Sequence, residues 1–235
     1  MAVAVVVSGG GPPDPGATVG LPAGALVVAA DSGLDHARAL GLTVDVVVGD
    51  LDSVSAPALE AAEAAGAVVE RHPEAKDATD LELALDLAVA RGARRIVVLG
   101  PATGRLDHLL AGAVLLAAPR YADVEVEARL GPARLAVVRP GRPAALTGRP
   151  GELVTLVPVH GTAVGVTTEG LLYPLRDEDL PPGTTRGVSN EMLGARAAVT
   201  LRAGTLVAVL PGATGSHARR RLRTDFGGGR ARRPE

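Results

Sequence analysis

The sequence predicts an α/β fold joined to an all-β part: a Rossmann-like parallel sheet with flanking helices, followed by an antiparallel β-sandwich. Up to about residue 120, short runs of β-branched residues alternate with Ala/Leu-rich segments at helical spacing. After Pro119, runs of Val, Thr and Leu are broken by Gly or Pro about every 8 to 12 residues. With 235 residues, 47% of them hydrophobic, the chain is long enough to form two modest cores.

The first part contains five strand candidates and four helix candidates. Continuous apolar runs, typical of strands that helices cover on both faces, occur at residues 3–7, 26–30, 44–48, 67–69 and 95–99. Apolar residues at helical spacing predict helices at residues 34–40, 56–65, 81–90 and 106–117. We therefore expect an α/β domain over residues 1–125, a β-sandwich over 126–211 and an Arg/Gly-rich, disordered tail over 212–235.

Charge and composition exclude several classes of protein. The tail holds seven Arg against Asp225 and Glu235, a local charge of +5, so the rest of the chain carries −7 of the net −2. An acidic body argues against nucleic-acid binding, which requires Lys and Arg to neutralise phosphates. No run approaches the ~18 to 20 apolar residues of a membrane span, and the absence of Cys fits a reducing compartment. We expect a cytoplasmic protein that binds neither membrane nor nucleic acid.

Acidic residues follow several of the predicted strands. Asp31 follows the second strand, and Asp50 and Asp52 follow the third, while Asp80 begins the third predicted helix. Ligands of open parallel sheets bind outside the carboxyl ends of the strands, so these side chains are expected to converge there. Carboxylates aimed together repel unless a cation joins them, and hard oxygen ligands favour Mg²⁺. Alternatively, these residues only cap helices or solvate loops.

Further polar residues stand beside the acidic ones. Thr79 and Glu82 match a capping box at the start of the third helix. Lys76 is the only lysine of an Arg-preferring chain, which favours a need for a compact ammonium near phosphate. Arg105 and His108 lie three residues apart at the start of the fourth helix, where they can hold phosphate. Ordinary capping, solvation or packing is the alternative for each.

In this order, the strings ADSG, VVVGDLDSV, KDATDLELAL, GRLDH, GLLYPL and SNE resemble the thiamine pyrophosphokinase (thiamine diphosphokinase) family over about residues 3 to 210. The resemblance implies an ATP-dependent enzyme that converts ATP and thiamine into AMP and thiamine diphosphate and requires Mg²⁺. It also implies a homodimer whose sites lie between the α/β domain of one chain and the β-sandwich of the other. The α/β domain would bind nucleotide and carry catalysis, and the β-sandwich would bind thiamine and dimerise.

The resemblance also implies roles for individual residues. The acidic positions for metal and diphosphate match Asp31, Asp50, Asp52 and Asp80. The segments lining the nucleotide and thiamine site contain Gly33, Lys76, Thr79, Arg105, Asp107 and His108, and the β-domain segments that approach thiamine contain Thr167, Tyr173, Ser189 and Asn190. The chain departs from the family pattern at Leu51, where an aromatic is frequent, at Thr103-Gly104, where Gly-Gly is frequent, and at Tyr173, which replaces a common Trp.

The hypothesis is a direct in-line displacement, in which the substrate hydroxyl attacks the β-phosphorus of ATP and AMP departs. The catalytic set is Asp50, Asp52, Asp80, Arg105, Asp107 and His108. Asp107 either accepts the hydroxyl proton or only fixes Arg105. The alternatives are a diphosphokinase acting on a hydroxymethyl-pterin, a haloacid-dehalogenase-like phosphatase and a non-catalytic nucleotide-binding module. The phosphatase is an alternative because the string VVVGDLDSV imitates the DxDx[TV] motif of that class.

Overall fold

A computed structural model describes residues 2–12, 14–73, 75 and 77–212. The first part consists of β1 (Val3–Ser8), β2 (Leu26–Ala30), β3 (Val46–Gly49), β4 (Val68–Arg71), β5 (Arg95–Gly100) and β6 (Glu125–Leu130), with α1 (Gly33–Ala39), α2 (Ala56–Ala64), α3 (Asp80–Ala90) and α4 (Leu106–Leu116). Two 3₁₀ turns, η1 (Pro15–Thr18) and η2 (Pro119–Tyr121), complete it. The five predicted strands and four predicted helices are confirmed, with ends that shift by one or two residues.

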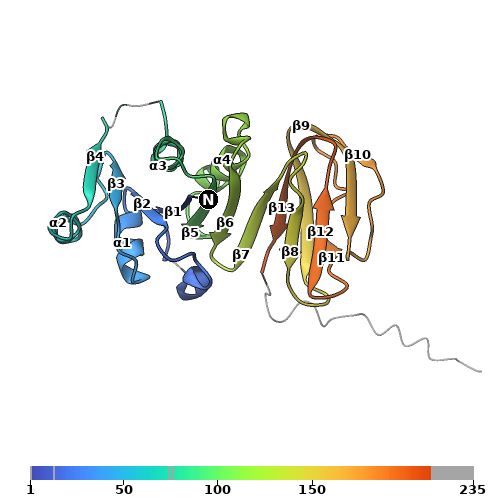
Figure 1. Cartoon of the computed structure of the whole chain (residues 1–235), viewed down its shortest axis with the longest axis horizontal. Coiled ribbons are helices and arrows are strands. Elements are labelled where there is room, and N and C mark those ends of the chain that lie inside the picture. Colours follow the sequence, from blue (N-terminus) through green and yellow to red (C-terminus); the bar gives the residue numbers. More distant parts are fainter. Residues whose placement is uncertain (1, 13, 74, 76, 213–235) are drawn as a thin grey trace, which may run out of the picture.

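The strands of this part form a parallel sheet in the order β4-β3-β2-β1-β5-β6. Apolar residues of α1 and α2 pack on one face, and those of α3 and α4 pack on the other (Figure 1). The β-branched strand residues are therefore buried on both faces, as their continuous apolar runs predicted. β6, which was not among the predicted strands, pairs with β5 over six residues; the predicted boundary after residue 125 falls at its first residue.

The second part is antiparallel and consists of β7 (Ala133–Val138), β8 (Ala144–Thr147), β9 (Leu153–Glu169), β10 (Glu178–Leu180), β11 (Asn190–Glu191), β12 (Arg196–Thr200) and β13 (Ala203–Leu210). It has its own apolar core. β6 pairs antiparallel with β7, and β7 pairs with β13, so hydrogen-bonded strands run without interruption from one part into the other. The predicted change from an α/β part to a β-rich part is confirmed in outline.

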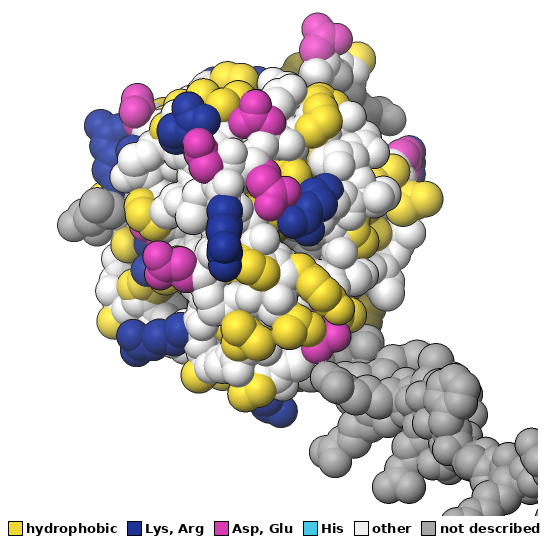
Figure 2. Space-filling model, turned by 90° about the vertical axis from the view of Figure 1, so that its right-hand side faces the viewer, with side chains coloured by type: hydrophobic (Ala, Val, Ile, Leu, Met, Phe, Trp, Pro, Cys, Tyr) yellow, Lys and Arg dark blue, Asp and Glu magenta, His cyan; other side chains and the backbone are white. Residues whose placement is uncertain are grey.

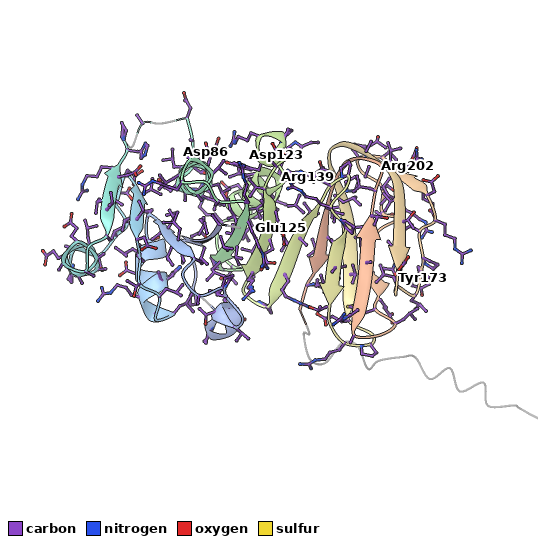
Figure 3. The ribbon with its side chains drawn as sticks, viewed as in Figure 1. Asp86, Asp123, Glu125, Arg139, Tyr173 and Arg202 are labelled. Carbon is purple, nitrogen blue, oxygen red and sulfur yellow. The ribbon has the colours of Figure 1, made fainter. Side chains whose placement is uncertain are left out.

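The two parts are also tied together by a buried arginine. Arg139 follows β7 and is only 7% exposed, and its guanidinium donates to the backbone carbonyls of Ala117, Ala118 and Tyr121 at the end of α4 and in η2. Figure 3 shows Arg139 in the middle of the molecule, between the parts. Because helix C-terminal carbonyls lack intrahelical donors, this cation supplies the missing hydrogen bonds.

Several apolar side chains remain exposed. Seen from the antiparallel end, hydrophobic side chains gather in the lower half of the face, below a region where basic and acidic side chains are mixed (Figure 2). The most exposed large apolar residues of the antiparallel part are Leu153, Leu172, Tyr173, Val188 and Leu193. In the α/β part, Leu106, Leu110 and Val114 form an exposed stripe along α4. Within the described residues, none of the helices has the length and apolar character that a membrane span requires.

Candidate active site

The strand order places a cavity at the carboxyl edge of the parallel sheet. β1 lies between β2 and β5, so the chain moves outward from β1 in one direction and then returns to its other side. At such a switch point the loops diverge and leave a crevice. A cavity of about 640 Å³ opens there, and of the predicted residues it is lined by Asp31, Thr79, Asp80, Arg105, Asp107 and His108.

Three of the four predicted metal ligands meet at this edge. Carboxylate oxygens of Asp31, Asp50 and Asp52 all lie within 4.8 Å of one another. Asp80 approaches the same place from α3, since its Oδ1 lies 3.0 Å from the position that a Cβ on Gly49 would occupy. The side chain that glycine lacks therefore leaves room for a fourth carboxylate next to Asp50.

The environment of Asp31 is typical of a residue that binds a metal cation. Burial raises the pKa of Asp31 above its ordinary value, and the carboxylates of Asp80, Asp50 and Asp52 raise it further, against the hydrogen bond from the Ser32 backbone. Its Oδ1 is buried and has no hydrogen-bond partner in the part of the chain that the structure describes. An unsatisfied buried carboxylate oxygen beside two more carboxylates is costly unless a cation is bound. The donor set fits Mg²⁺, which takes carboxylate oxygens and keeps several waters.

The backbone around these carboxylates adopts unusual conformations. Asp31 and Leu51 have φ values of 48° and 65°, in the left-handed region, and Gly49 has a φ of 146°. A non-glycine residue in this region costs about 1 kcal/mol or more and persists only where surrounding contacts hold it. Leu51 is held because its side chain is buried in the core beneath α1. Among the described residues of the α/β part, Asp31 and Leu51 are the non-glycine residues with a positive φ, and they lie in the two loops that supply the three carboxylates.

The predicted capping box at the start of α3 is confirmed for Thr79 but not for Glu82. Thr79 is the N-cap, and its Oγ1 accepts a hydrogen bond of 3.3 Å from the backbone N–H of Glu82. The Glu82 carboxylate pairs with Arg120. Asp80 is the first residue of α3, where the positive end of the helix dipole favours an ionised carboxylate.

At the mouth of the cavity, Arg105 and Asp107 pair with each other. Arg105 Nη2 donates to Asp107 Oδ2 over 2.6 Å, and Arg105 Nε donates to Oδ1 over 3.2 Å. This pairing lowers the pKa of Asp107 to about 2. Both side chains are mostly exposed, so the guanidinium is free to turn toward a phosphate. His108 lines the same cavity from the first turn of α4.

Two glycines and two serines shape the neighbouring loops. A Cβ on Gly33 would lie 2.0 Å from the carbonyl oxygen of Val7, so only glycine lets α1 approach β1 this closely. A Cβ on Gly9 would lie 2.1 Å from Ser32 Oγ. Ser8 and Ser32 line the cavity but were not predicted as site residues. Ser8 is the last residue of β1 and Ser32 is the second residue after β2, and this position at the end of a buried strand is the signal that would have identified them.

None of the predicted β-domain residues lines this cavity. The Asn190 side chain is 4% exposed: its Oδ1 accepts from the backbone N–H groups of Tyr173 and Glu191, and its Nδ2 donates to the Tyr173 carbonyl. Tyr173 is 55% exposed and lies far from the α/β part (Figure 3). Thr167 Oγ1 accepts from Asp177 N, and Ser189, with a φ of 58°, donates its N–H to Thr155 Oγ1. Lys76 lies outside the described residues.

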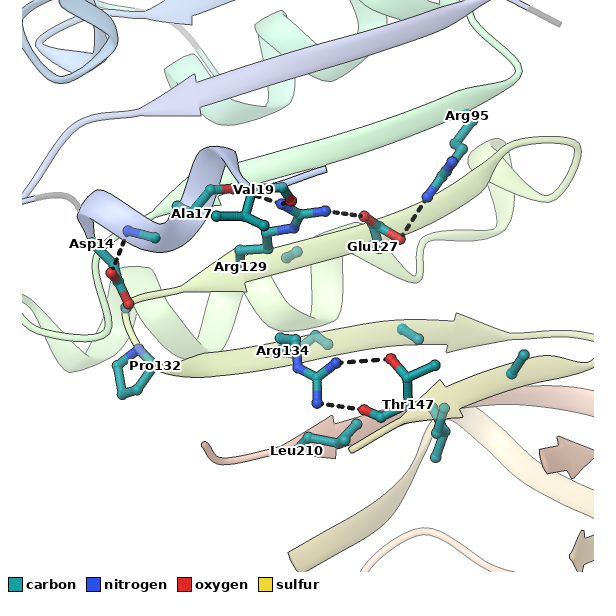
Figure 4. Close-up of a pocket in the computed structure, with 17 residues that line it drawn as sticks. Asp14, Ala17, Val19, Arg95, Glu127, Arg129, Pro132, Arg134, Thr147 and Leu210 are labelled. Carbon is teal, nitrogen blue, oxygen red and sulfur yellow. Dashed lines mark hydrogen bonds and ion pairs between the residues drawn. The ribbon is translucent and has the colours of Figure 1, made fainter. Parts of the chain in front are cut away.

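A second cavity, of about 490 Å³, lies between η1 and strands β5 to β8. Its guanidinium groups are engaged with protein acceptors, as Figure 4 shows. Arg129 donates to the carbonyls of Ala17 and Val19 and to Glu127, and Arg134 donates to the carbonyl of Thr147. These contacts hold η1 against β6 and β8 against β7. No predicted site residue that the structure describes lines this cavity.

Comparison with known proteins identifies both parts of the chain. Residues 21–128 match the family model described as thiamin pyrophosphokinase, catalytic domain, and residues 145–206 match the model described as thiamin pyrophosphokinase, vitamin B1 binding domain. Together these matches span more than half of the chain. A curated thiamine pyrophosphokinase from Bacillus subtilis (strain 168) is 26% identical over 161 residues, which are 68% of this chain and 75% of that protein.

Solved structures show the same architecture. The thiamine pyrophosphokinase of Bacillus subtilis superposes with a TM-score of 0.76 at 24% identity, covering 89% of this chain and 98% of that chain. The thiamin pyrophosphokinase of Geobacillus thermodenitrificans superposes with a TM-score of 0.72 at 29% identity, covering 89% and 96%. The likeness to the Bacillus subtilis structure, at 24% identity, shows the fold alone. The two family models match the two parts in their order along the chain. The chain belongs to the thiamin pyrophosphokinase family.

Proposed function

We propose that the protein is a thiamine diphosphokinase, which transfers the diphosphoryl group of ATP to the hydroxyl of thiamine and releases AMP. The observation that carries the proposal is the cluster of Asp31, Asp50 and Asp52 beside a 640 Å³ cavity, in a chain that matches both family models. The cavity is lined by apolar and polar residues, and its volume of about 640 Å³ lies in the range of small-molecule sites.

Asp31, Asp50 and Asp52 are the residues that would hold Mg²⁺, with Asp80 close behind them. When bound, this cation would neutralise the charge of the phosphates and orient them for displacement. The protein's own part is to bring carboxylates from two loops to one point and, as far as the described residues go, to leave Asp31 Oδ1 without a hydrogen-bond partner. The rigid strand ends that precede them limit how far they can move apart.

Arg105, Asp107 and His108 would act on the phosphate side of the cavity. Arg105 can present a fork of N–H donors to phosphate oxygens and spread the charge that builds up during transfer. We assign Asp107 the task of orienting Arg105, because its carboxylate accepts hydrogen bonds from both Nε and Nη2 of that guanidinium. His108 can donate to the departing phosphate.

The thiamine side of the site would come from a second copy of the chain, in a homodimer. Tyr173 is exposed, lies far from the cavity and belongs to the part that the vitamin B1 binding model matches. Exposed apolar residues on that part and along α4 supply surface that a partner would cover. In this arrangement the antiparallel part is a β-sandwich that binds thiamine and dimerises. A cytoplasmic location stays a prediction from the sequence.

The function is tested by incubating the purified protein with ATP, Mg²⁺ and thiamine and following products by mass spectrometry. AMP and thiamine diphosphate in equal amounts are expected. A parallel reaction with a hydroxymethyl-pterin as acceptor should yield no AMP. Release of inorganic phosphate alone, or ATP binding without AMP, would contradict the proposal.

The homodimer is tested by mixing two impaired variants at a thiamine concentration well below KM. Asp50→Asn lacks the metal side, and Tyr173→Ala weakens the thiamine side about 10-fold. If each site combines two chains, the mixture regains about one quarter of the wild-type activity at a 1:1 ratio, since half of the dimers are mixed and each holds one intact site. A mixture as inactive as its components, together with a monomeric mass in light scattering, would exclude the shared site.

A further inference from the structure

The loop that carries Asp50 and Asp52 is fixed at its far end by a residue of α1. Ser55 donates from its Oγ to Asp35 Oδ1 over 2.7 Å and from its backbone N–H to Asp35 Oδ2 over 3.3 Å. Both oxygens of one carboxylate thus receive hydrogen bonds from one residue. Such a paired, charge-assisted contact restricts direction as well as distance.

Ser55 binds Asp35 instead of making the helix-capping hydrogen bond that its position before α2 favours. It is the N-cap residue of α2, with an extended backbone (φ −68°, ψ 131°), yet its side chain makes no capping hydrogen bond. A serine at this position normally accepts a hydrogen bond from the second or third helical N–H, which stabilises a helix by about 1 kcal/mol. The hydroxyl is instead directed to Asp35, so the chain forgoes the cap and gains a link between α1 and the loop.

The near end of the loop is fixed by a different contact. Leu51 adopts a φ of 65° and buries its side chain in the core beneath α1. Between Leu51 and Ser55, the polar contacts are local: Asp52 N donates to Asp50 Oδ1 over 3.3 Å, and Ser53 Oγ donates to Asp52 Oδ1 over 2.8 Å. Within the described residues, the loop is therefore held by the buried side chain of Leu51 and by the hydrogen bonds from Ser55 to the Asp35 carboxylate.

α1 connects this loop to Asp31 as well. It begins two residues after Asp31, and Asp35 lies in its first turn. The same helix contacts the loop after β1, because His36 Nδ1 lies 2.9 Å from the carbonyl oxygen of Ser8. Since the three metal-site carboxylates come from two loops, their mutual distances depend on what holds those loops to each other.

We infer that Asp35 is a positioning residue for the metal site: by binding Ser55 it sets the loop of Asp50 and Asp52 relative to Asp31. The inference rests on the proposed function, because it concerns the Mg²⁺ that this function requires. Residues that orient metal ligands typically contribute about 10- to 100-fold to metal affinity. Asp35 itself is not one of the three carboxylates that meet.

The test is direct binding of Mn²⁺, as a paramagnetic substitute for Mg²⁺, to the purified protein without nucleotide, followed by electron paramagnetic resonance. Asp35→Ala should weaken binding about 10-fold and Ser55→Ala about 5-fold. Ser55→Thr keeps the hydroxyl and should restore near wild-type affinity. The double variant Asp35→Ala/Ser55→Ala should be no weaker than Asp35→Ala, because both changes remove one contact.

Two controls separate this role from others. Glu63→Gln removes an exposed carboxylate from α2 and should leave Mn²⁺ affinity unchanged. Circular dichroism melting checks that each variant is folded. If only Asp35→Ala were weak while Ser55→Ala bound like wild type, the effect would be charge through space and the inference would be wrong.

The outcomes also distinguish this inference from the proposed function. A wild-type protein that forms thiamine diphosphate, with Asp35→Ala binding Mn²⁺ equally well, would overturn the inference alone. A wild-type protein that binds no Mn²⁺ would overturn the inference, and one that forms no thiamine diphosphate would overturn the proposed function. Losses that multiply in the double variant would show that Asp35 and Ser55 act separately, which contradicts the inference.

Discussion

Asp31 in the α/β part and Asn190 in the antiparallel part both place a polar oxygen out of contact with water, and they differ in what surrounds it. Asn190 Oδ1 accepts two backbone N–H groups, so its hydrogen-bonding capacity is used within the fold. Asp31 Oδ1 has no hydrogen-bond partner among the described residues, stands among like charges and belongs to a residue with a left-handed backbone. A satisfied buried group holds a structure together, whereas an unsatisfied and strained one is maintained for a ligand.

This contrast is tested most strongly at the strand-end carboxylates. Asp50→Asn should lower the rate of thiamine diphosphate formation by about 100-fold or more, equivalent to about 3 kcal/mol of transition-state stabilisation. Its unfolding midpoint should stay close to that of the wild type, because the amide has the same shape. Initial rates and thermal melts of the variant and of Glu63→Gln decide the matter. Wild-type turnover in Asp50→Asn would refute its role as a ligand.

At Arg139, by contrast with Asp50, a substitution should reduce stability and leave turnover nearly unchanged. Arg139→Ala leaves buried carbonyls of Ala117, Ala118 and Tyr121 without donors, which should lower the free energy of unfolding by about 3 kcal/mol. At 15 °C, where the variant is still folded, its turnover should stay within about 3-fold of wild type. Arg139→Lys, which can reach one of the carbonyls, should recover part of the loss. Urea unfolding gives the values, and an unchanged midpoint for Arg139→Ala would contradict the structural role.

Tyr173 tests the exposed face of the antiparallel part. Tyr173→Ala should raise KM for thiamine by about 10-fold, since an aromatic stacking contact contributes about 0.5–1.5 kcal/mol. KM for ATP and Mn²⁺ affinity should not change. Tyr173→Phe keeps the ring and should behave like wild type. A Tyr173→Ala enzyme with unaltered KM for thiamine would remove Tyr173 from the site.

The smallest predicted effect is an increase in stability, and it concerns Asp31. The pKa of Asp31 is raised in the folded protein, so its ionised form is disfavoured there. Its stabilising contribution is complete below the pKa of the unfolded chain and is lost as the pH rises through the higher folded-state pKa. At pH 7, Asp31→Asn should therefore slightly increase the free energy of unfolding, and Asn also tolerates a left-handed φ.

The same variant should lose activity and should no longer be stabilised by added Mg²⁺. Thermal melts with and without 10 mM Mg²⁺, at about pH 4 and pH 7, provide the check, and the gain over wild type should shrink at the lower pH. A variant less stable than wild type at pH 7 would mean that the Asp31 carboxylate is not under electrostatic strain.

The local patterns in the sequence predicted most of the α/β part, because buried parallel strands and amphipathic helices leave periodic signals. β6 was not predicted, since Glu125, Glu127 and Arg129 interrupt its apolar run where one face meets η1 and charged neighbours. The convergence of Asp31, Asp50 and Asp52 followed from their places after adjacent strands. Asp35 and Ser55 were not predicted as a pair, because a contact between residues twenty apart depends on how two helices pack.

Because β7 and β13 are hydrogen-bonded neighbours, the chain enters and leaves the rest of the antiparallel part at adjacent points. Residues 139–202 therefore form an excursion whose entry and exit lie side by side, in the manner of an insert held by a two-stranded stem. A chimaera that exchanges this insert between relatives has to be joined at both strands of the stem together. A single crossover near residue 125 would instead combine β5 of one relative with β6 of another, although the two strands share six paired residues.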